Sequence, residues 1–487
     1  MRHRYYRVLL IMLISITTSS VFAESFSIDG ITYEVISNSE VAITSASKNV
    51  INVVIPSQVT NGSKTYDVVS IGEKAFYECR DMTSITLPNS IRIIGKEGFR
   101  RCSSLTSITI PEGITEIRDD TFRGCESLTS FNIPKSVKTI GNRAFQACYG
   151  LLSITIPDNV TEVLGNAFCN CSKLTTINIG SGVTKIETGT FMGCKEATSV
   201  TIGNNVISIG ESAFNGCSSL TSIILPDGVT FIGKKAFYEC RSLETINIPN
   251  GVTTINEKTF LCCNNLNVFP IHENVTRIGV NAFYECNSLT SITIPKSVSE
   301  IDGYAFANCT GLTSVTILSS EITIVAAFEK CTSIQQVELH CKYIDSWFSK
   351  KETISKIIIG EEVNKIDYGA FSGCSGLTDV YCYAELVPHT ESDAFDNVVS
   401  KYNAKNVSLH VPESSIASYR LNEPWKYFNI VALTEQELGV ESVWVDDNDV
   451  DDVEWYQLNG LKTNSPKRGL NIIRTKNGMS KKVYVNR

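Results

Sequence analysis

The chain has 487 residues, 43% of them hydrophobic and 19% charged, and its 43 basic and 51 acidic residues give a net charge of −8. This acidic balance argues against nucleic acid as a partner, because phosphate backbones are bound by clustered lysine and arginine. The whole chain has only five histidines, which leaves little material for acid–base catalysis.

Residues 1–23 have the pattern of a secretory signal peptide. Three arginines precede an apolar run over residues 8–16, and Ala23 ends the segment before Glu24. The run is too short to span a membrane, and no later stretch approaches the about 20 apolar residues of a spanning helix. We therefore expect an exported chain without a transmembrane segment, either secreted or held at the cell surface, including association with the outer membrane.

Residues 24–66 are predicted to form an N-terminal cap. Apolar and polar residues alternate on both sides of Asp29-Gly30, which predicts a β-hairpin. The stretch Ile51–Ile55 then imitates a strand of the repeat described next, without its phenylalanine and cysteine. An atypical closing unit is expected at the end of a repeat array, where apolar surface and an open sheet edge would otherwise face water.

A repeat organises the chain from residue 67 to residue 382, in about 14 copies. Its frame is Val-x-x-Ile-Gly-x-x-Ala-Phe-x-x-Cys-x-x-Leu-Thr-Ser-Ile-x-Ile-Pro. A period of this length predicts a solenoid. The phenylalanine recurs every 23 residues and then at slightly different steps: Phe76, Phe99, Phe122, Phe145, Phe168, Phe191, Phe214, Phe237, Phe260, Phe283, Phe306, Phe328, Phe348 and Phe371.

One repeat cannot cover its own apolar residues. Ile108 and Ile110 alternate with a threonine, so both face one side of a short strand, which Pro111 ends. Ile114 and Ile117 add a second short apolar step. Neighbouring repeats must bury these residues for each other. We predict a β-rich leucine-rich repeat solenoid of the α/β type, with one parallel strand per repeat of about 23 residues.

The chain has 17 cysteines, which suggests either a disulfide framework or a structural column. Stacked repeats place column members about 4.8 Å apart, but side chains that project in parallel have the wrong relative direction for a disulfide. A buried thiol also acts as a small apolar residue and is a poor nucleophile. We favour a structural column formed by the cysteines three residues after a repeat phenylalanine: Cys79, Cys102, Cys125, Cys148, Cys171, Cys194, Cys217, Cys240, Cys263, Cys286, Cys309, Cys331 and Cys374.

Four cysteines lie outside this column: Cys169, Cys262, Cys341 and Cys382. Cys382 takes the place of the second strand isoleucine, so we expect it in the core. Cys169 and Cys262 each lie close to a column cysteine, but no second pair or nearby histidine completes a zinc site. We expect no metal and no cofactor.

The residues between the buried strand positions are mostly threonine, serine and asparagine, as in Thr106-Ser107-Ile108-Thr109. Threonine suits strands, and neighbouring hydroxyls can pair across a ladder, so most of this face is interpreted as maintaining the sheet. A shallow repetitive strip could also bind an extended partner weakly, with multivalency adding strength.

Candidate binding residues lie where the frame loosens. The first group is Gln335, Gln336, Glu338, His340, Tyr343 and Trp347, and the second is Asp379 and Tyr381. A third set consists of Tyr-Glu dipeptides at 77–78, 238–239 and 284–285 and an early basic patch of Arg80, Arg100, Arg101 and Arg123. For each group the alternative is an ordinary surface or a decayed repeat.

Three segments follow the repeats. Residues 383–434 are predicted to close the last coil with aromatic bulk, including Trp425 and Phe428. Residues 435–454 read as an acidic linker, because the aspartates from Asp447 lack the glycine and glutamate spacing of a calcium loop. Residues 455–487 alternate as three short strands over 455–460, 469–473 and 481–485.

The frame, as in Ile232-Gly-Lys-Lys-Ala-Phe237-Tyr-Glu-Cys240-Arg-Ser-Leu243, resembles the BspA-type (Treponema-type) leucine-rich repeats of bacterial surface antigens. The resemblance implies a secreted or surface protein that mediates adhesion to host matrix proteins or other cells. It carries over no binding residue, because the family has no fixed binding motif. Residues 455–487 are similar to the C-terminal sorting domains of Bacteroidota cargo proteins, although Leu470 stands where those domains have an aromatic residue.

Two classes of function remain. The favoured class is a non-catalytic protein, expected to be a monomer, that binds an extracellular protein or cell-surface ligand, with capture of a surface glycan or nutrient as the alternative. The other class is an enzyme, a hydrolase with a site that we do not recognise. The sequence has no Gly-x-Ser-x-Gly, His-Glu-x-x-His or phosphate loop.

Overall fold

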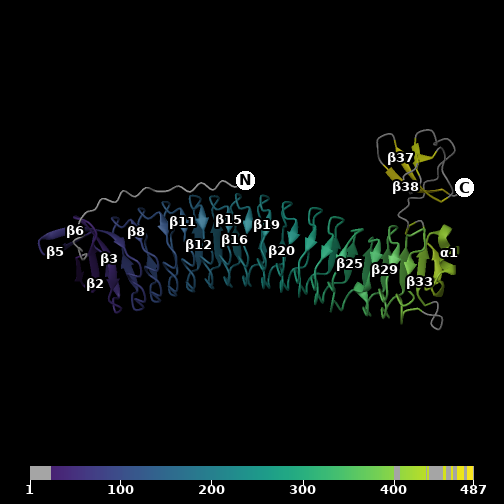
Figure 1. The fold of residues 1–487 in the computed structure, drawn as a ribbon, viewed down its shortest axis with the longest axis horizontal. Coiled ribbons are helices and arrows are strands. Elements are labelled where there is room, and N and C mark those ends of the chain that lie inside the picture. The colour runs from purple at the N-terminus through teal and green to yellow at the C-terminus, as the bar shows by residue number, and fades with distance from the viewer. Residues whose placement is uncertain are drawn as a thin grey trace, which may run out of the picture. The chain divides into compact units, whose positions relative to one another are not determined.

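The computed structural model describes residues 24–399, 406–434 and 436–437, and the backbone of β35 (Val453–Tyr456), β36 (Lys462–Thr463), β37 (Gly469–Thr475) and β38 (Ser480–Val485). The predicted signal peptide and most of the predicted acidic linker lie outside these residues. The chain divides into two compact units, Met1–Val206 and Ile207–Arg487. Within each unit, successive coils of the chain lie side by side (Figure 1). Among the described residues, no helix is long and apolar enough to cross a membrane.

The first unit begins with the predicted hairpin. β1 (Ser25–Ile28) and β2 (Ile31–Val35) pair antiparallel across Asp29-Gly30. β3 (Glu40–Ala46), β5 (Gln58–Asn61) and β6 (Lys64–Ile71) complete one sheet in the order β1-β2-β3-β6-β5. β4 (Asn52–Val54) pairs parallel with the first repeat strand, as its imitation of that strand predicted.

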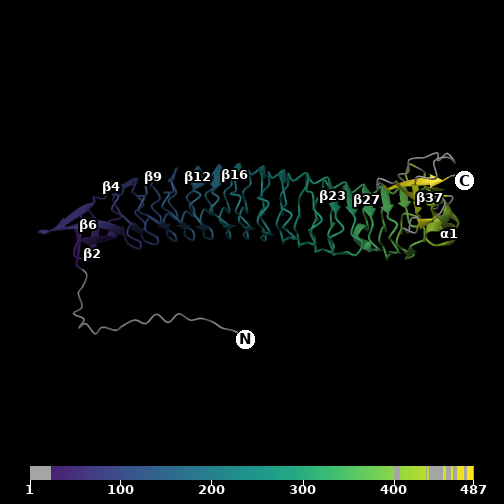
Figure 2. The same ribbon diagram turned by 90° about the horizontal axis from the view of Figure 1, so that it is seen from above.

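The predicted repeat strands pair in parallel with the strands of neighbouring repeats (Figure 2). We call this set of strands in either unit the first ladder. In the first unit β12 pairs with β14 so that Ile154 lies beside Ile177, one repeat later. The strands are β7 (Ser84–Thr86), β9 (Ser107–Ile108), β12 (Ser153–Ile156), β14 (Thr176–Ile179) and β16 (Ser199–Thr201). In the second unit they are β18 (Ser222–Ile223), β20 (Thr245–Ile246), β23 (Ser291–Ile294), β25 (Ser314–Ile317), β27 (Gln336–Leu339), β29 (Lys356–Ile359) and β31 (Asp379–Cys382). Two further parallel strands, β33 (Ser408–Val411) and β34 (Asn429–Ala432), extend this ladder into the segment predicted as a C-terminal cap.

A second parallel ladder, which the sequence analysis did not assign as strands, forms from the second apolar step of each repeat. In the first unit it comprises β8 (Ile93–Ile94), β10 (Glu116–Ile117), β11 (Thr139–Ile140), β13 (Glu162–Val163) and β15 (Lys185–Ile186). In the second unit it comprises β17 (Ser208–Ile209), β19 (Phe231–Ile232), β21 (Thr254–Ile255), β22 (Arg277–Ile278), β24 (Glu300–Ile301), β26 (Thr323–Ile324), β28 (Tyr343–Ile344), β30 (Lys365–Ile366) and β32 (His389–Thr390).

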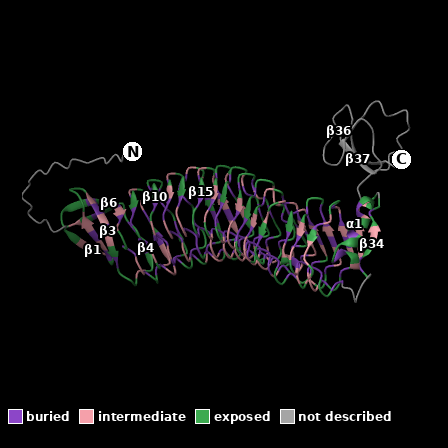
Figure 3. Cartoon of the chain, turned by 45° about the vertical axis from the view of Figure 1, so that its right-hand side comes forward, coloured by how far each residue is buried: buried purple, intermediate pink, exposed green. Residues whose placement is uncertain are grey.

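The repeat phenylalanines form a stacked row in the core of each unit. Phe99 and Phe122 have ring centroids 5.5 Å apart with planes 2° from parallel, and Phe283 and Phe306 are 5.0 Å apart at 1°. The rings are fully buried, and nearly all inward isoleucines of both ladders are buried. Buried positions line the inside of the coils and exposed positions the outside (Figure 3). The predicted common row of aromatic rings is therefore confirmed from Phe76 to Phe191 in the first unit and from Phe214 to Phe348 in the second.

The cysteines are free thiols, and the disulfide alternative is wrong for them. Column S–H groups donate to the carbonyl oxygen of the phenylalanine one coil earlier, as Cys102 does to Phe76 at 3.1 Å and Cys309 to Phe283 at 3.1 Å, whereas Cys79, the first of the column, donates to the Ser47 carbonyl at 3.7 Å. Burial raises the pKa of column thiols such as Cys125, whose pKa rises to about 12, whereas a hydrogen bond from Cys309 lowers the pKa of Cys331. Lys351 takes the cysteine position after Phe348, and its ammonium group donates to the Phe328 carbonyl at 2.8 Å.

The turn around each phenylalanine makes a third set of bonds between coils. The backbone N–H groups of Lys74, Phe76 and Glu78 donate to carbonyl oxygens one coil later at 3.0, 2.9 and 2.8 Å. The first and last of these three donors have positive φ, 57° at Lys74 and at Glu78, and glycine takes such a position at Gly124 with φ 73°. The left-handed backbone conformation at these positions lets the N–H groups of Lys74, Phe76 and Glu78 point towards the next coil. The turn therefore forms hydrogen bonds with the next coil although it is not a β-strand.

The first ladder is interrupted where phenylalanine replaces the first strand isoleucine, at Phe131 and at Phe269. No strand is formed at these two described coils. Phe131 packs against Phe122 and Phe145 with ring centroids 5.0 and 4.7 Å apart. A ring at this position requires more space than isoleucine, and the local strand bonds are lost.

The second unit ends in a cap of aromatic residues. Phe395 stacks on Phe371 at 5.3 Å and so continues the row beyond the last phenylalanine counted in the sequence. Trp425 and Phe428 pack edge-on against Phe395 at 5.4 and 5.2 Å. The cap contains η2 (Glu413–Ser415), α1 (Ile416–Leu421) and η3 (Trp425–Tyr427), and η1 (Ser346–Phe348) lies earlier. The tail strands β35, β37 and β38 form where strands were predicted, with β36 as a fourth.

Candidate binding surface

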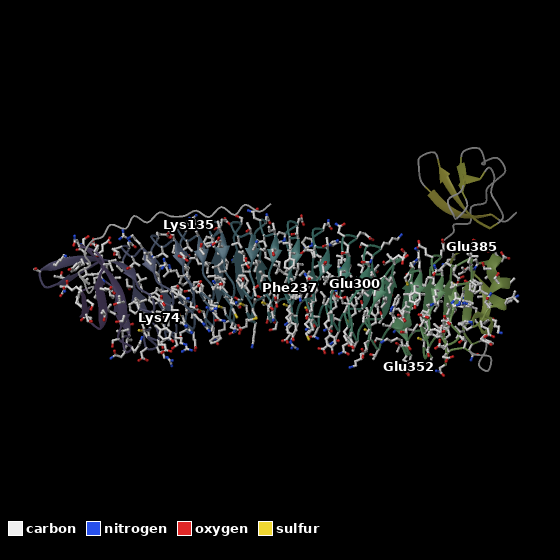
Figure 4. The ribbon with its side chains drawn as sticks, in the orientation of Figure 1. Lys74, Lys135, Phe237, Glu300, Glu352 and Glu385 are labelled. Carbon is white, nitrogen blue, oxygen red and sulfur yellow. The ribbon has the colours of Figure 1, made fainter. Side chains whose placement is uncertain are left out.

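The outward face is the solvent-exposed side of the first ladder. In the regular repeats, its threonine hydroxyls hydrogen-bond to the backbone of the neighbouring coil. Thr106 Oγ1 donates to the carbonyl of Thr83 at 3.1 Å, and Thr313 Oγ1 does the same to Thr290 at 2.9 Å. These hydroxyls bond backbone carbonyls one coil earlier, rather than each other. These hydroxyls therefore stabilise the contact between coils, in line with our interpretation of the threonine pattern as maintaining the sheet. Charged side chains such as Lys135 and Glu352 point away from the coils (Figure 4).

The outward face changes character from β27 onward. Serine and threonine at Ser314 and Thr316 are followed, in register, by Gln336 and Glu338. The same two positions then carry Lys356 and Ile358, Asp379 and Tyr381, and finally Ser408 and His410. We call Gln336, Glu338, His340, Lys356, Asp379, Tyr381 and His410 the C-terminal patch. All seven side chains are partly exposed.

Glu338 and His340 form one end of this patch. Glu338 lies on β27 and His340 directly follows that strand. His340 Nε2 is 2.9 Å from Glu338 Oε1. Gly360 makes room for the imidazole, because a Cβ there would lie 2.6 Å from His340 Nδ1. Glu338 also accepts a hydrogen bond from Thr316 Oγ1 at 3.4 Å. Both predicted residues are thus held in fixed positions.

Asp379 and Tyr381 form the other end together with two residues that the sequence analysis missed. The ring of His410 stacks on Tyr381 with centroids 4.2 Å apart, and His410 Nε2 lies 3.3 Å from Asp379 Oδ1. Lys356 Nζ lies 4.6 Å from the centroid of the Tyr381 ring, a cation–π distance. Burial, then the nearby Asp379 and Glu437, raises the pKa of Tyr381, so its hydroxyl stays protonated.

Three predicted residues lie apart from the patch. Gln335 is exposed just before β27. Tyr343 belongs to β28 of the second ladder, where Lys365 Nζ lies 5.2 Å from its ring. Trp347 lies in η1, and its Nε1 is buried without a hydrogen bond among the described residues. The structure brings Gln336, Glu338, His340, Asp379 and Tyr381 onto one face and leaves Tyr343 and Trp347 elsewhere.

The early basic patch is largely neutralised by carboxylates. Arg101 lies 2.7 Å from Glu78, and Arg100 lies 2.7 Å from Glu97. The buried carboxylate of Asp120 accepts hydrogen bonds from Arg143 at 3.0 and 2.9 Å and from Arg123 at 3.2 Å. Burial acts to raise the pKa of Asp120, but these arginines outweigh it and lower the pKa. The pairs of Arg101 with Glu78 and of Arg143 with Asp120 link neighbouring coils, and the other two lie within one coil.

Over the part of the chain that the structure describes, no group of three or more histidine, cysteine, aspartate or glutamate side chains is placed to hold a metal ion. Cys262, the one described cysteine that is not fully buried, donates to Glu285 Oε2 at 3.3 Å. Burial, followed by Glu285, raises its pKa to about 11. A thiol protonated to this degree is a weak nucleophile at neutral pH.

Comparison with known proteins identifies the family. Residues 69–198, 184–313 and 299–413 each match the BspA type leucine rich repeat region, in 6 copies. These matches span well over half of the 487 residues. The chain belongs to the BspA-type leucine-rich repeat family. The resemblance found in the sequence is thereby confirmed, and with it the predicted fold class.

Solved structures of bacterial repeat proteins are similar to this BspA-type chain. A leucine-rich repeat protein from Bacteroides ovatus is 26% identical, with 83% of this chain and 99% of that chain covered and a TM-score of 0.51. A leucine rich cell surface protein from Faecalibacterium prausnitzii is 29% identical over 73% of this chain and 94% of that chain, with a TM-score of 0.44. Among curated proteins, none matches this chain. Solenoids of this class present extended surfaces for interaction with other proteins.

Proposed function

We propose that this BspA-type protein is exported and acts outside the cell as a non-catalytic adhesion protein. It binds an extracellular protein or a ligand on another cell, and the C-terminal patch makes the specific contact. The observation that supports this most strongly is the change along one face of the first ladder. Small uncharged side chains give way, over β27 to β33, to carboxylates, histidines, a lysine and a tyrosine.

The composition of the patch suits protein recognition. Interface residues that contribute most binding energy are enriched in tryptophan, tyrosine and arginine, whereas serine and threonine are under-represented among them, and the patch includes Tyr381. Contacts within the patch also fix its side chains before a partner arrives, such as the 2.9 Å pair of His340 and Glu338. Such preorganisation lowers the entropic cost of binding. Tyr381 has one face against His410 and Lys356 near its ring, so it offers its edge and hydroxyl rather than an open ring face.

The proposal is tested by solid-phase binding of the purified mature protein to immobilised matrix proteins, mucin and intact bacterial cells. We expect saturable binding to at least one of these surfaces and no turnover in a panel of peptidase, glycosidase and esterase substrates. Binding to purified glycans alone would instead favour capture of a nutrient. Turnover that survives repurification would overturn the non-catalytic assignment.

A further inference from the structure

The segment that follows the last strand of the array is fastened onto the outward face of the first ladder. After β34 the chain turns at Thr434, whose N–H donates to Glu437 Oε2 at 2.7 Å. The Glu437 N–H donates back to Thr434 Oγ1 at 3.3 Å. The hydroxyl of Tyr383 donates to the carbonyl oxygen of Glu437 at 2.9 Å. Glu437 therefore lies over the strands that end the array.

His410 lies between two carboxylates that belong to different parts of the chain. Its Nε2 is 3.3 Å from Asp379 Oδ1 on β31, and its Nδ1 is 3.3 Å from Glu437 Oε1. The ring stacks on Tyr381 and only 16% of the side chain is exposed. Nδ1 is buried and has no hydrogen-bond partner among the described residues, although the Glu437 carboxylate faces it.

Only the imidazolium form of histidine has a proton on both ring nitrogens. The neutral ring can donate to Asp379 or to Glu437, and its other nitrogen then places a lone pair against a carboxylate. Protonated His410 therefore satisfies both carboxylates, whereas neutral His410 repels one of them. Histidine is also the side chain that ordinarily changes charge between about pH 5 and pH 8.

The other charged and titratable groups around His410 are compatible with this dependence. Lys356 on β29 lies over the Tyr381 ring, and Glu338 on β27 is paired with His340. Burial acts to raise the pKa of Glu437, but hydrogen bonds from Thr434 and the charge of His410 outweigh it and lower the pKa. Burial raises the pKa of Tyr383, with Glu437 and Glu338 adding to the effect. Glu437 thus stays ionised and Tyr383 stays neutral throughout the range in which histidine titrates.

We propose that His410 and Glu437 form a pH-operated clasp, closed when His410 is protonated and opened when it loses its proton. In the closed state, Glu437 covers the part of the C-terminal patch formed by Tyr381 and His410. In the open state, Asp379 keeps His410 in place while the Thr434–Glu437 turn is released. Opening exposes more of the patch as pH rises, so the clasp regulates access to it.

Hydrogen–deuterium exchange of the full mature protein, read by mass spectrometry on peptides ending at Glu437, tests the clasp without any ligand. Each rate is divided by that of the unfolded chain at the same pH. For the wild type, we expect protection of residues 433–437 to fall roughly tenfold between about pH 5.5 and pH 8, because the partly buried ion pair between His410 and Glu437 is lost. His410→Gln and Glu437→Gln should each show the low, pH-independent protection of the open state.

His389→Gln is the matched control, because His389 is exposed and lies 3.9 Å from Glu391, away from Glu437. It should retain the wild-type pH dependence. Protection of residues 433–437 in the wild type that is equal at both pH values would overturn the proposal, whether or not the variants fold. Retention of pH dependence in Glu437→Gln would do the same. Because no partner is involved, these results do not depend on the adhesive function proposed above.

Discussion

Truncation of one ring in the phenylalanine row tests how the coils share their core. Phe283 is fully buried and contacts three aromatic neighbours. Its ring stacks on Phe260 at 5.4 Å and on Phe306 at 5.0 Å, and Phe269 meets it edge-on at 4.6 Å. Phe283→Ala removes all three contacts and leaves a cavity between coils.

The expected loss follows from burial and from the number of aromatic neighbours. Replacing a buried phenylalanine by alanine costs about 3–5 kcal/mol. Phe237 is the matched comparison, because it is equally buried and stacks on two rings, at 5.5 and 5.6 Å, without an edge-on neighbour. One aromatic pair contributes about 0.5–1.5 kcal/mol beyond burial, so Phe283→Ala should cost about 1 kcal/mol more than Phe237→Ala. Phe231 is 50% exposed, and Phe231→Ala should cost less than about 1 kcal/mol.

Native-state hydrogen exchange measures these losses coil by coil, which a single unfolding midpoint cannot do for a repeat array. We expect Phe283→Ala to lower protection in the coils of Phe260 and Phe306 as well as its own, because repeat stability is shared between neighbours. Loss confined to the mutated turn, or an equal loss in Phe231→Ala, would refute a shared core.

Three further outcomes follow from the contacts described. Iodoacetamide at about pH 8 should label native protein slowly, and first at Cys262, because the other described cysteines are buried; peptide mapping that finds a column cysteine labelled first would contradict this. Cys286→Ala removes one of two hydrogen bonds to the Phe260 carbonyl, which accepts from Cys286 at 3.3 Å and from the Cys263 N–H at 3.1 Å, and should cost about 0.5–1.5 kcal/mol in local exchange measurements, with Cys286→Ser costing less. Asp120→Asn should destabilise the first unit at neutral pH by about 1–2 kcal/mol, discounted because the paired arginines are partly exposed. Since the pKa of Asp120 is lowered, its contribution is complete above the unfolded value of about 3.9 and lost as pH falls through the folded value, so the two proteins should converge in acid; a constant difference would refute the role of its charge.

The sequence predicted the features that depend on a fixed period. A step of 23 residues places Phe99 over Phe76 and Ile177 beside Ile154, so the core row and the first ladder could be read from spacing alone. The second ladder was missed because each strand is only two residues long, as at Glu116–Ile117. The interruptions at Phe131 and Phe269 depend on ring size at one strand position, which an apolar pattern does not distinguish.

The binding surface was harder to predict, because part of it depends on register across irregular loops. Tyr381 and His410 are register partners although 29 residues separate them, so the repeat period could not pair them. Glu338 and His340 were found because Glu338 lies on β27 and His340 directly follows that strand. Tyr343 follows closely in sequence but belongs to the second ladder, where the chain has already turned. Sequence proximity within a coil therefore does not imply a shared face.

The affinity of matched variants for the surface that binds the wild type tests the central claim most directly. Glu338→Ala/Tyr381→Ala alters the C-terminal patch, and Ser291→Ala/Thr293→Ala alters the regular part of the same face in the same unit. We predict that the patch variant binds at least about tenfold more weakly, with an unchanged circular dichroism spectrum, while the strip variant binds like the wild type. Wild-type affinity in the patch variant, or an equal loss in both variants, would contradict specific binding through the patch.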